Sequence, residues 1–339
     1  MAADDRGGAL ARWAPGLLLA TLLLLTGVAT YATAARLHDR ERDQLTEDAQ
    51  EATAAIDRRM NDYGQILRGA AGLYNASDNV TYTDFHNYFA DQDVARRFPG
   101  FQAIAFASYV PRAGLPAHVR RARRDIAASG LAYPPFRPYP PLKPTDQEAL
   151  VIDHLEPPPG TNRAFGFNLL SEANRRRAAL LARRTGEPAV TAPISLVNTP
   201  GSSLGIDLMV PVYGGPPSQT GAPREWTGVV FAAFRMDNLL RGVLGAGAGG
   251  ADLEIYDVGP AATVPEGTGI TRSAVAFDLR PGRATAARDA DHTRIRSLEV
   301  AGRRWAIAYT RAGTTLSDGE RAVPWVIAVA GVLVSLLAA

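Results

Sequence analysis

The chain of 339 residues contains no cysteine. This absence excludes disulfide bonds, thiolate metal sites, a thiol nucleophile and a lipid anchor on cysteine. The chain also has no large excess of positive or negative charge, since it contains 36 basic and 34 acidic residues. A nucleic-acid-binding domain needs a basic stripe, so we expect no nucleic acid as a partner. Lysine is almost missing, because Lys143 is the only one among the basic residues.

The sequence also lacks the motifs of common hydrolases and metalloenzymes. None of the five histidines forms an HxxxH or HExxH pair, and no GxSxG motif occurs. The glycine-rich stretch 245–250 follows a predicted helix and leads into a predicted strand, so we interpret it as a turn and not a nucleotide loop. His154 and Glu156 could form half of a metal site, but we favour an ordinary pocket or surface pair. We therefore expect no catalytic residue, no metal site and no cofactor.

Two long apolar runs lie at the ends of the chain. Residues 14–35 contain no charged side chain, and at about 1.5 Å per residue a helix of this length spans the hydrocarbon core of a membrane. Residues 322–339 are uncharged as well. We predict transmembrane helices at 14–35 and 322–339, with residues 1–13 as a cytoplasmic N-terminus. A cleaved signal peptide and a buried core helix are the respective alternatives.

The charges that flank the first run do not fix its orientation. A long segment between two spans is usually translocated, so we predict that residues 36–320 are extracytoplasmic, periplasmic or extracellular. The protein would then lie in the cell inner membrane. Because the second run ends with the chain, we expect a truncated helix and a natural protein that continues into the cytoplasm.

The residues after the first run predict a stalk helix. No glycine or proline occurs between residues 35 and 64, and apolar residues recur three or four positions apart from Ala49 to Leu73, with one violation at Arg59. We predict one continuous stalk helix over residues 36–74. Its first half is expected to meet a partner protomer in a homodimer, whereas the half from Ile56 onward should pack on its own domain.

The remaining residues predict an α+β fold with antiparallel sheets. The strands are joined mostly by short connections and not by regular helical crossovers. We divide them into two PAS-like modules, a membrane-distal one over residues 75–225 and a membrane-proximal one over 226–320. Helices are predicted at 84–98 with Thr83 as cap, at 116–129, at 172–185 with Ser171 as cap and Gly186 as terminator, and at 236–244. Strands are predicted at 101–110, 149–155, 189–197, 204–213, 226–234, 251–258, 269–278, 293–300 and 303–309.

An ordered set of short motifs occupies the centre of the chain. Its members are Phe98-Pro-Gly-Phe101, Val110-Pro-Arg112, His154-Leu-Glu-Pro157, Phe165-Gly-Phe-Asn168, Thr191-Ala-Pro193, Leu204-Gly205 and Pro211-Val-Tyr213. In order and spacing this set resembles the CHASE family of extracytoplasmic sensor domains, over about residues 82–240. The resemblance implies two PAS-like modules between two membrane spans, ahead of a cytoplasmic histidine kinase or a diguanylate or nucleotide cyclase.

The resemblance also implies a ligand site in the membrane-distal module. The plant cytokinin receptors of the family use an aspartate, a threonine and a leucine. Thr191 matches the threonine and Leu180 or Leu181 the leucine. The aspartate has no match between Glu156 and Asn162, and Asn168 stands where an aspartate is frequent in the family.

A small-molecule pocket combines apolar walls with a few directed polar groups. Walls are expected from Phe106, Tyr139, Phe165, Phe167, Leu180 and Met209, and hydrogen bonds from Thr191, Glu156 and Asn162. The alternative for each aromatic residue is ordinary core, and for Asn168 it is a cap at a helix start.

From these patterns we predict the small-molecule-sensing portion of a transmembrane signalling receptor. The residues present carry no catalysis, and the full-length protein would be a signalling enzyme. The alternative is an ectodomain with a filled core that serves structure or protein interaction without a small ligand. A cavity enclosed by Tyr139, Thr191 and Met209 would favour the first hypothesis.

Overall fold

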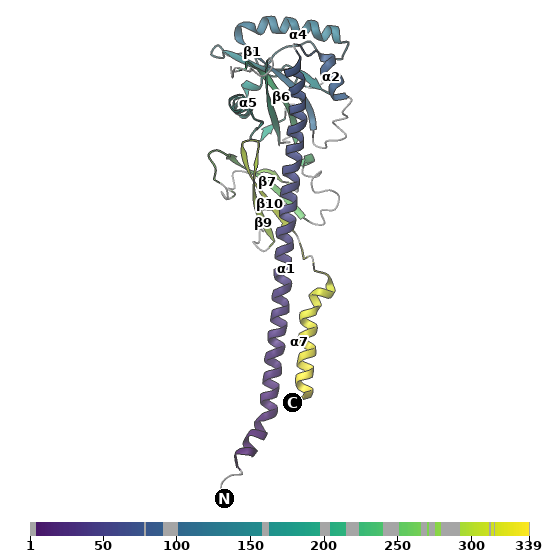
Figure 1. Ribbon diagram of the computed structural model, residues 1–339, viewed down its shortest axis with the longest axis vertical. Coiled ribbons are helices and arrows are strands. Elements are labelled where there is room, and N and C mark those ends of the chain that lie inside the picture. Colours follow the sequence, from purple (N-terminus) through teal and green to yellow (C-terminus); the bar gives the residue numbers. More distant parts are fainter. Residues whose placement is uncertain are drawn as a thin grey trace. The chain divides into compact units, whose positions relative to one another are not determined.

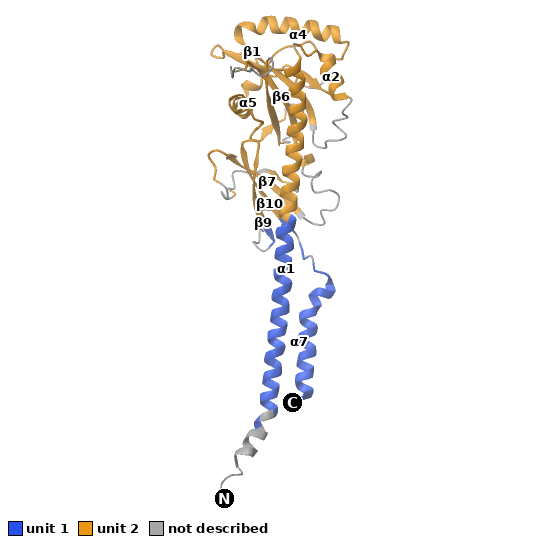
Figure 2. Cartoon of the chain, in the orientation of Figure 1, with its two compact units in different colours: residues 1–48, 286–294, 310–339 blue, residues 49–285, 295–309 orange. Residues whose placement is uncertain are grey.

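The computed structural model describes residues 5–77, 79–90, 101–157, 163–196, 204–214, 224–239, 251–265, 270, 275–278, 292–311, 313–314 and 316–338. The chain divides into two compact units (Figure 2). Unit 1 comprises residues 1–48, 286–294 and 310–339, and unit 2 comprises residues 49–285 and 295–309. The candidate site described below lies in unit 2.

Helix α1 (Asp5–Ala76) is a single continuous helix that includes both the first apolar run and the predicted stalk. In unit 2 its apolar positions face the domain, because Ile56, Tyr63 and Leu67 are fully buried. The ring of Tyr63 stacks on Phe234 with 4.8 Å between centroids. This half of the helix therefore packs on its own domain, as its spacing predicted.

Judged by length and composition, helices α1 and α7 (Asp318–Ala338) each contain a segment that is long and apolar enough to cross a membrane. They contact each other within unit 1. A side chain at Gly331 of α7 would collide with Thr26 of α1, so glycine permits the close approach there.

The first sheet is antiparallel and has six strands in the order β2-β1-β6-β5-β3, with β4 paired to β5 (Figure 1). These strands are β1 (Phe101–Pro111), β2 (Glu148–Glu156), β3 (Ala189–Val190), β4 (Ile194–Ser195), β5 (Leu204–Tyr213) and β6 (Trp226–Arg235). Helices α2 (Tyr82–Ala90), α4 (Leu115–Ser129) and α5 (Ala173–Thr185) accompany it, and α4 lies across one end of the sheet (Figure 1).

The second sheet has the order β8-β7-β10-β9. Its strands are β7 (Ala251–Pro260), β8 (Val275–Asp278), β9 (Thr293–Val300) and β10 (Arg303–Arg311). The predicted α+β class, with a long N-terminal helix and two antiparallel sheets, is confirmed.

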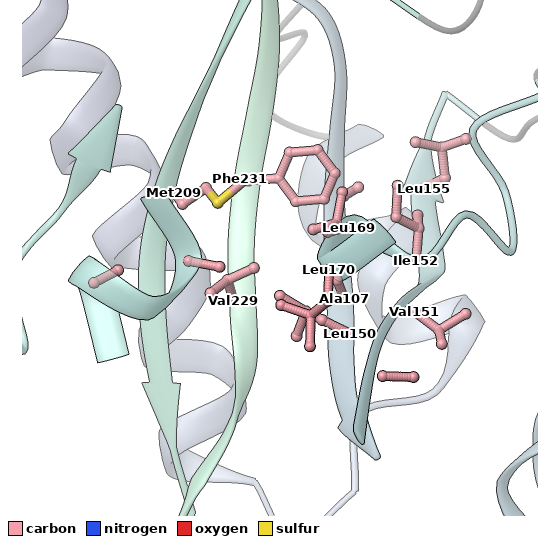
Figure 3. Packing of buried hydrophobic residues seen from close by; sticks show 14 of the residues in the cluster. Ala107, Leu150, Val151, Ile152, Leu155, Leu169, Leu170, Met209, Val229 and Phe231 are labelled. Carbon is pink, nitrogen blue, oxygen red and sulfur yellow. The ribbon is translucent and has the colours of Figure 1, made fainter. Parts of the chain in front are cut away.

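One apolar core fills the space between the first sheet and α5. Met209, Val229 and Phe231 of β5 and β6 lie on one side of the short 3-10 helix η2 (Leu169–Ser171), and Leu150 and Ile152 of β2, at the edge of the same sheet, lie on the other (Figure 3). Burial of such side chains stabilises a fold by roughly 1.5–3 kcal/mol each. This core holds the strands that form the floor of the candidate site.

Two predicted helix caps are wrong. Helix α2 starts after Thr81 and not Thr83, because Thr81 and Asp84 form a reciprocal capping box: the Thr81 hydroxyl accepts from the amide of Asp84, whose carboxylate accepts from the amide of Thr81. Helix α5 is capped by the carboxylate of Glu172, since the hydroxyl of Ser171 donates instead to the carbonyl of Asn168 at 2.6 Å.

Two predicted elements differ in extent. The strand predicted at 189–197 is split into β3 and β4 on either side of Pro193, which has no amide hydrogen for a ladder. Of the helix predicted at 236–244, residues 236–239 are helical and the rest lies outside the described residues. The same holds for residues 91–98 of the helix predicted at 84–98.

Candidate functional site

A cavity of about 840 Å³ lies where the end of α1 meets α2, α4 and the first sheet. A volume of this size suits a small molecule. Its lining includes Tyr74, Tyr82, Phe106, Ser108, Tyr109, Ala117, His118, Arg121, Asp125, Asp153, His154, Glu225, Trp226 and Thr227.

A β-bulge in β2 positions the central carboxylate of this cavity. Phe106 of β1 pairs with His154, but the next residue, Ala107, pairs with Ile152. Asp153 is thus the extra residue, opposed by none on β1. Bulges of this kind re-aim a side chain and are frequent beside functional sites.

Asp153 is buried and held by three side chains. The hydroxyl of Ser108 donates to its Oδ2 at 2.6 Å, Nδ1 of His154 lies 3.2 Å from Oδ1, and Nε2 of His118 lies 3.1 Å from Oδ2. Burial alone would raise the pKa of Asp153, but the two adjacent imidazoles hold it well below its usual range. Asp153 is therefore a carboxylate at neutral pH.

The proton of His118 is placed by its second neighbour. Nη2 of Arg121 lies 3.1 Å from Nδ1 of His118, and a guanidinium group only donates hydrogen bonds. Nδ1 is therefore the acceptor and the proton of the neutral ring sits on Nε2, on the side of Asp153. Arg121 thus places this proton on the side of His118 that faces the carboxylate.

Several buried polar atoms of the cavity lining have no hydrogen-bond partner among the described residues. They are the hydroxyls of Tyr74 and Tyr82, Nε2 of His154, Nε1 of Trp226, and Nε2 of His118, whose 3.1 Å approach to Asp153 lacks hydrogen-bond geometry. Tyr82 and His154 are only 2% and 8% exposed. Burial, together with the nearby charge of Asp153, raises the pKa of Tyr74 and of Tyr82, so both hydroxyls are neutral. Unsatisfied buried groups are rare in proteins, and their gathering in one cavity suits a bound polar ligand.

Aromatic rings supply the walls around these polar atoms. His154 stacks on Tyr82 with centroids 4.4 Å apart, and Tyr74 stacks on Phe106 at 3.9 Å. The arrangement offers a carboxylate, hydroxyls and an imidazole nitrogen inside a ring-lined space.

The predicted site residues are not brought together in this cavity. Among the described ones, Phe106 alone lines it. Glu156 instead pairs with Nδ1 of His86 at 2.8 Å, and burial raises the pKa of its carboxyl. Leu180 is a half-buried residue of α5, and Asn162 lies outside the described residues.

The other predicted residues belong to the core side of the sheet. Phe165 and Met209 are buried in the apolar core. Tyr139 packs edge-on to Phe167 at 5.5 Å between centroids. Thr191 is buried, and its hydroxyl accepts from the amide of Asp207 at 3.0 Å, which ties β3 to β5.

A second cavity of about 400 Å³ lies between α4 and the proline-rich segment, with Pro138, Pro140 and Asn168 in its lining. Tyr139, Thr191 and Met209 line neither cavity. The oxygen of the Asn168 side chain accepts from the amides of Leu150 and Leu170 at 3.0 and 3.1 Å. The interpretation of Asn168 as a cap is therefore correct.

Sequence reasoning missed Asp153, His118 and Tyr82. One signal was available, because Asp153-His154 is a polar pair inside the otherwise apolar run Ala149–Leu155. His118 and Tyr82 carried no comparable signal. The described residues contain no group of histidine and acidic side chains that could hold a metal ion.

Residues 78–266, more than half of the chain, match the family model of the CHASE domain. The chain belongs to the CHASE-domain family. This membership confirms the predicted class, a sensor domain, and extends the match beyond the residues that carried the resemblance.

Solved structures similar to this CHASE domain share little sequence with it. An extracellular ligand binding receptor from Desulfohalobium retbaense is 13% identical with a TM-score of 0.42; the alignment covers 79% of this chain and 39% of that one. The periplasmic sensory domain of the Campylobacter jejuni chemoreceptor Tlp1 is 12% identical with a TM-score of 0.39, over 82% and 96% of the two chains. The ligand-binding domain of the Pseudomonas aeruginosa amino acid chemoreceptor PctC, in complex with GABA, is 12% identical with a TM-score of 0.40, over 80% and 99%. No curated protein matches the chain.

Proposed function

We propose that the chain is the extracytoplasmic small-molecule-sensing part of a transmembrane receptor. The observation that carries the proposal is the 840 Å³ cavity with its buried carboxylate and unpartnered polar atoms. The cavity is not the one expected at Tyr139, Thr191 and Met209, which line neither cavity, but its presence supports a ligand-binding domain over an ectodomain with a filled core. Phe106 is the member of the originally predicted site that we assign to the ligand.

The signal would travel along α1. Tyr74 lines the cavity and belongs to the same continuous helix as the predicted span at 14–35. A second route joins the modules we propose at 75–225 and 226–320. The amide of Val190 in β3 donates to the carbonyl of Ala301, in the turn between β9 and β10, at 3.0 Å. A ligand shifts the equilibrium between two conformations of the receptor only if it binds one conformation more tightly than the other.

We further propose a homodimer in the inner membrane, with residues 36–320 outside the cytoplasm and a histidine kinase or cyclase as output. The lack of native cysteine makes this topology testable. Ala128→Cys places a thiol on the exposed face of α4. In cells whose outer membrane or wall has been removed but whose inner membrane is intact, this thiol should react with a membrane-impermeant maleimide. Labelling only after cell lysis would contradict the extracytoplasmic placement.

Ligand binding is tested with the full chain in lipid nanodiscs and a thermal-shift screen of small molecules. Ala117→Trp places an indole at the cavity wall, and Ala127→Trp on the same helix but outside the lining is its control. We expect a compound that stabilises the wild type and Ala127→Trp but not Ala117→Trp. Stabilisation of none of the folded proteins by any compound would refute the proposal.

A further inference from the structure

We propose that this cavity recognises a small organic cation with a primary ammonium group, for which Asp153 supplies the counter-charge. The inference rests on the proposed function and specifies the chemistry of the ligand. Three features of the cavity carry it: the sign of its charges, the kind of its unpartnered atoms, and the nature of its walls.

The charge of the lining is acidic. Asp153, Asp125 and Glu225 line the cavity, whereas Arg121 is its one guanidinium among the described residues and is engaged with His118. Of these, Asp153 is the buried one, so its charge is the least screened by water. An anionic ligand would have to approach this carboxylate, while a cation compensates it.

The unpartnered atoms next to Asp153 include acceptors. Nδ1 of His154 lies 3.2 Å from the carboxylate and donates to it, so Nε2 presents a lone pair whenever the ring carries a single proton. The hydroxyl oxygens of Tyr74 and Tyr82 also accept hydrogen bonds. These three atoms have no partner among the described residues, and an ammonium group offers three N–H donors.

The walls favour a cation as well. Tyr74, Tyr82, Phe106 and Trp226 line the cavity with aromatic surface. The face of an aromatic ring attracts a cation, most strongly where water is excluded. Trp226 adds one unpartnered donor, Nε1, which suits an acceptor elsewhere on the ligand.

The test compares amines with neutral and acidic compounds of the same shape on the wild-type full chain in nanodiscs. The probes are butylamine, hexylamine and 2-phenylethylamine, each with its matched alcohol and carboxylate, and binding is measured by calorimetry. We expect at least one amine to bind about 10- to 100-fold more tightly than its alcohol, which corresponds to one charge-assisted hydrogen-bonded contact. The carboxylates should bind more weakly than the alcohols.

Two variants locate the effect. Asp153→Asn should abolish the preference for amine over alcohol, and Tyr82→Phe should weaken amine binding several-fold. Tyr88→Phe, on the same helix but outside the cavity lining, is the matched control and should bind like the wild type. Because amines and alcohols are compared on the wild-type protein, that comparison decides the question even if Asp153→Asn does not fold.

Equal binding of amine and alcohol, tighter binding of the carboxylate, or amine binding that survives both variants would overturn the inference. A neutral or acidic compound that binds more tightly than every amine, and whose binding is lost in Ala117→Trp, would overturn it while upholding the sensing function. Failure of every compound class to bind the folded chain would overturn both.

Discussion

The buried ion pair between Arg175 of α5 and Asp207 of β5 gives a sharp prediction about the core that supports the cavity. Nε of Arg175 lies 2.8 Å from Oδ2 of Asp207, and the two side chains are 6% and 1% exposed. Arg175→Met keeps the bulk of the stem but leaves the carboxylate without a counter-charge. Breaking a buried pair in this way costs about 3–5 kcal/mol. For a domain of this size each kcal/mol is worth roughly 2–4 °C, so the apparent Tm should fall by roughly 6–20 °C.

The loss should depend on pH, with a sign that follows from Asp207. Burial raises the pKa of Asp207 above its ordinary value, and the charge of Arg175 opposes the rise. A raised pKa in the folded state means that the folded protein binds the proton more tightly than the unfolded chain. The stabilisation from that proton is complete below the unfolded pKa of about 3.9 and is lost as pH rises through the folded value. Without Arg175 the pKa of Asp207 rises further, so the deficit of the variant should be smaller at pH 5 than at pH 7.5.

The assay is thermal unfolding of the detergent-purified full chain at pH 7.5 and pH 5. Arg175→Met/Asp207→Leu should recover most of the lost stability, since an apolar pair can replace a buried ion pair. Arg68→Met is the control, because the pair of Arg68 with Glu187 is solvent-exposed and worth less than about 1 kcal/mol. A variant that melts with the wild type at both pH values, or a double variant no better than the single one, would refute the reasoning.

Three further variants test local features by the same unfolding assay. Asn168→Ala should cost about 2–4 kcal/mol, because two buried backbone amides lose their acceptor; Asn168→Asp keeps the acceptor and should lose less. Gly166→Ala should be far more destabilising than Gly130→Ala: both glycines have positive φ, but only the new methyl group at Gly166 would strike backbone, the carbonyl of Arg137. Glu172→Ala should cost about 1 kcal/mol, since it removes the cap of α5. Equal Tm values within either pair, or an unchanged Tm for Glu172→Ala, would contradict these assignments.

The elements that the sequence predicted best are those whose signal is local. Strands β5 and β9 have the predicted bounds, because a glycine-containing turn follows each of them directly. The cap of α2 was readable too, since Thr81 and Asp84 have the spacing of a capping box, whereas Thr83 merely has a suitable side chain. The cap of α5 was not, because the competing bond of Ser171 arises only once η2 has formed.

The candidate site was hidden from the sequence for a different reason. Its polar atoms come from α1, α2, α4, β1 and β2, so no short motif contains them. The bulge decides the rest, because a register shift against β1 is a property of two strands and cannot be read from either one. If side chains alternated regularly along β2, Asp153 would point to the face opposite to both of its neighbours. The sequence of β2 gives no indication that Ser108 and His118 lie next to the carboxylate of Asp153.

Thr191 matches the ligand threonine of the family, and Asn168 stands where an aspartate is frequent in the family; both side chains are used inside the fold. The hydroxyl of Thr191 is used by the amide of Asp207, and the side-chain oxygen of Asn168 is shared by two backbone amides. The oxygen of Asn168 cannot accept from a ligand without leaving a buried amide unsatisfied, at a cost of about 1–3 kcal/mol. Tyr82 and His154 carry the opposite imbalance, with buried polar atoms that no described residue satisfies. A ligand that binds Tyr82 and His154 gains hydrogen bonds, whereas a ligand at Asn168 breaks them, and this difference supports our proposal of a ligand site beside the bulge at Asp153.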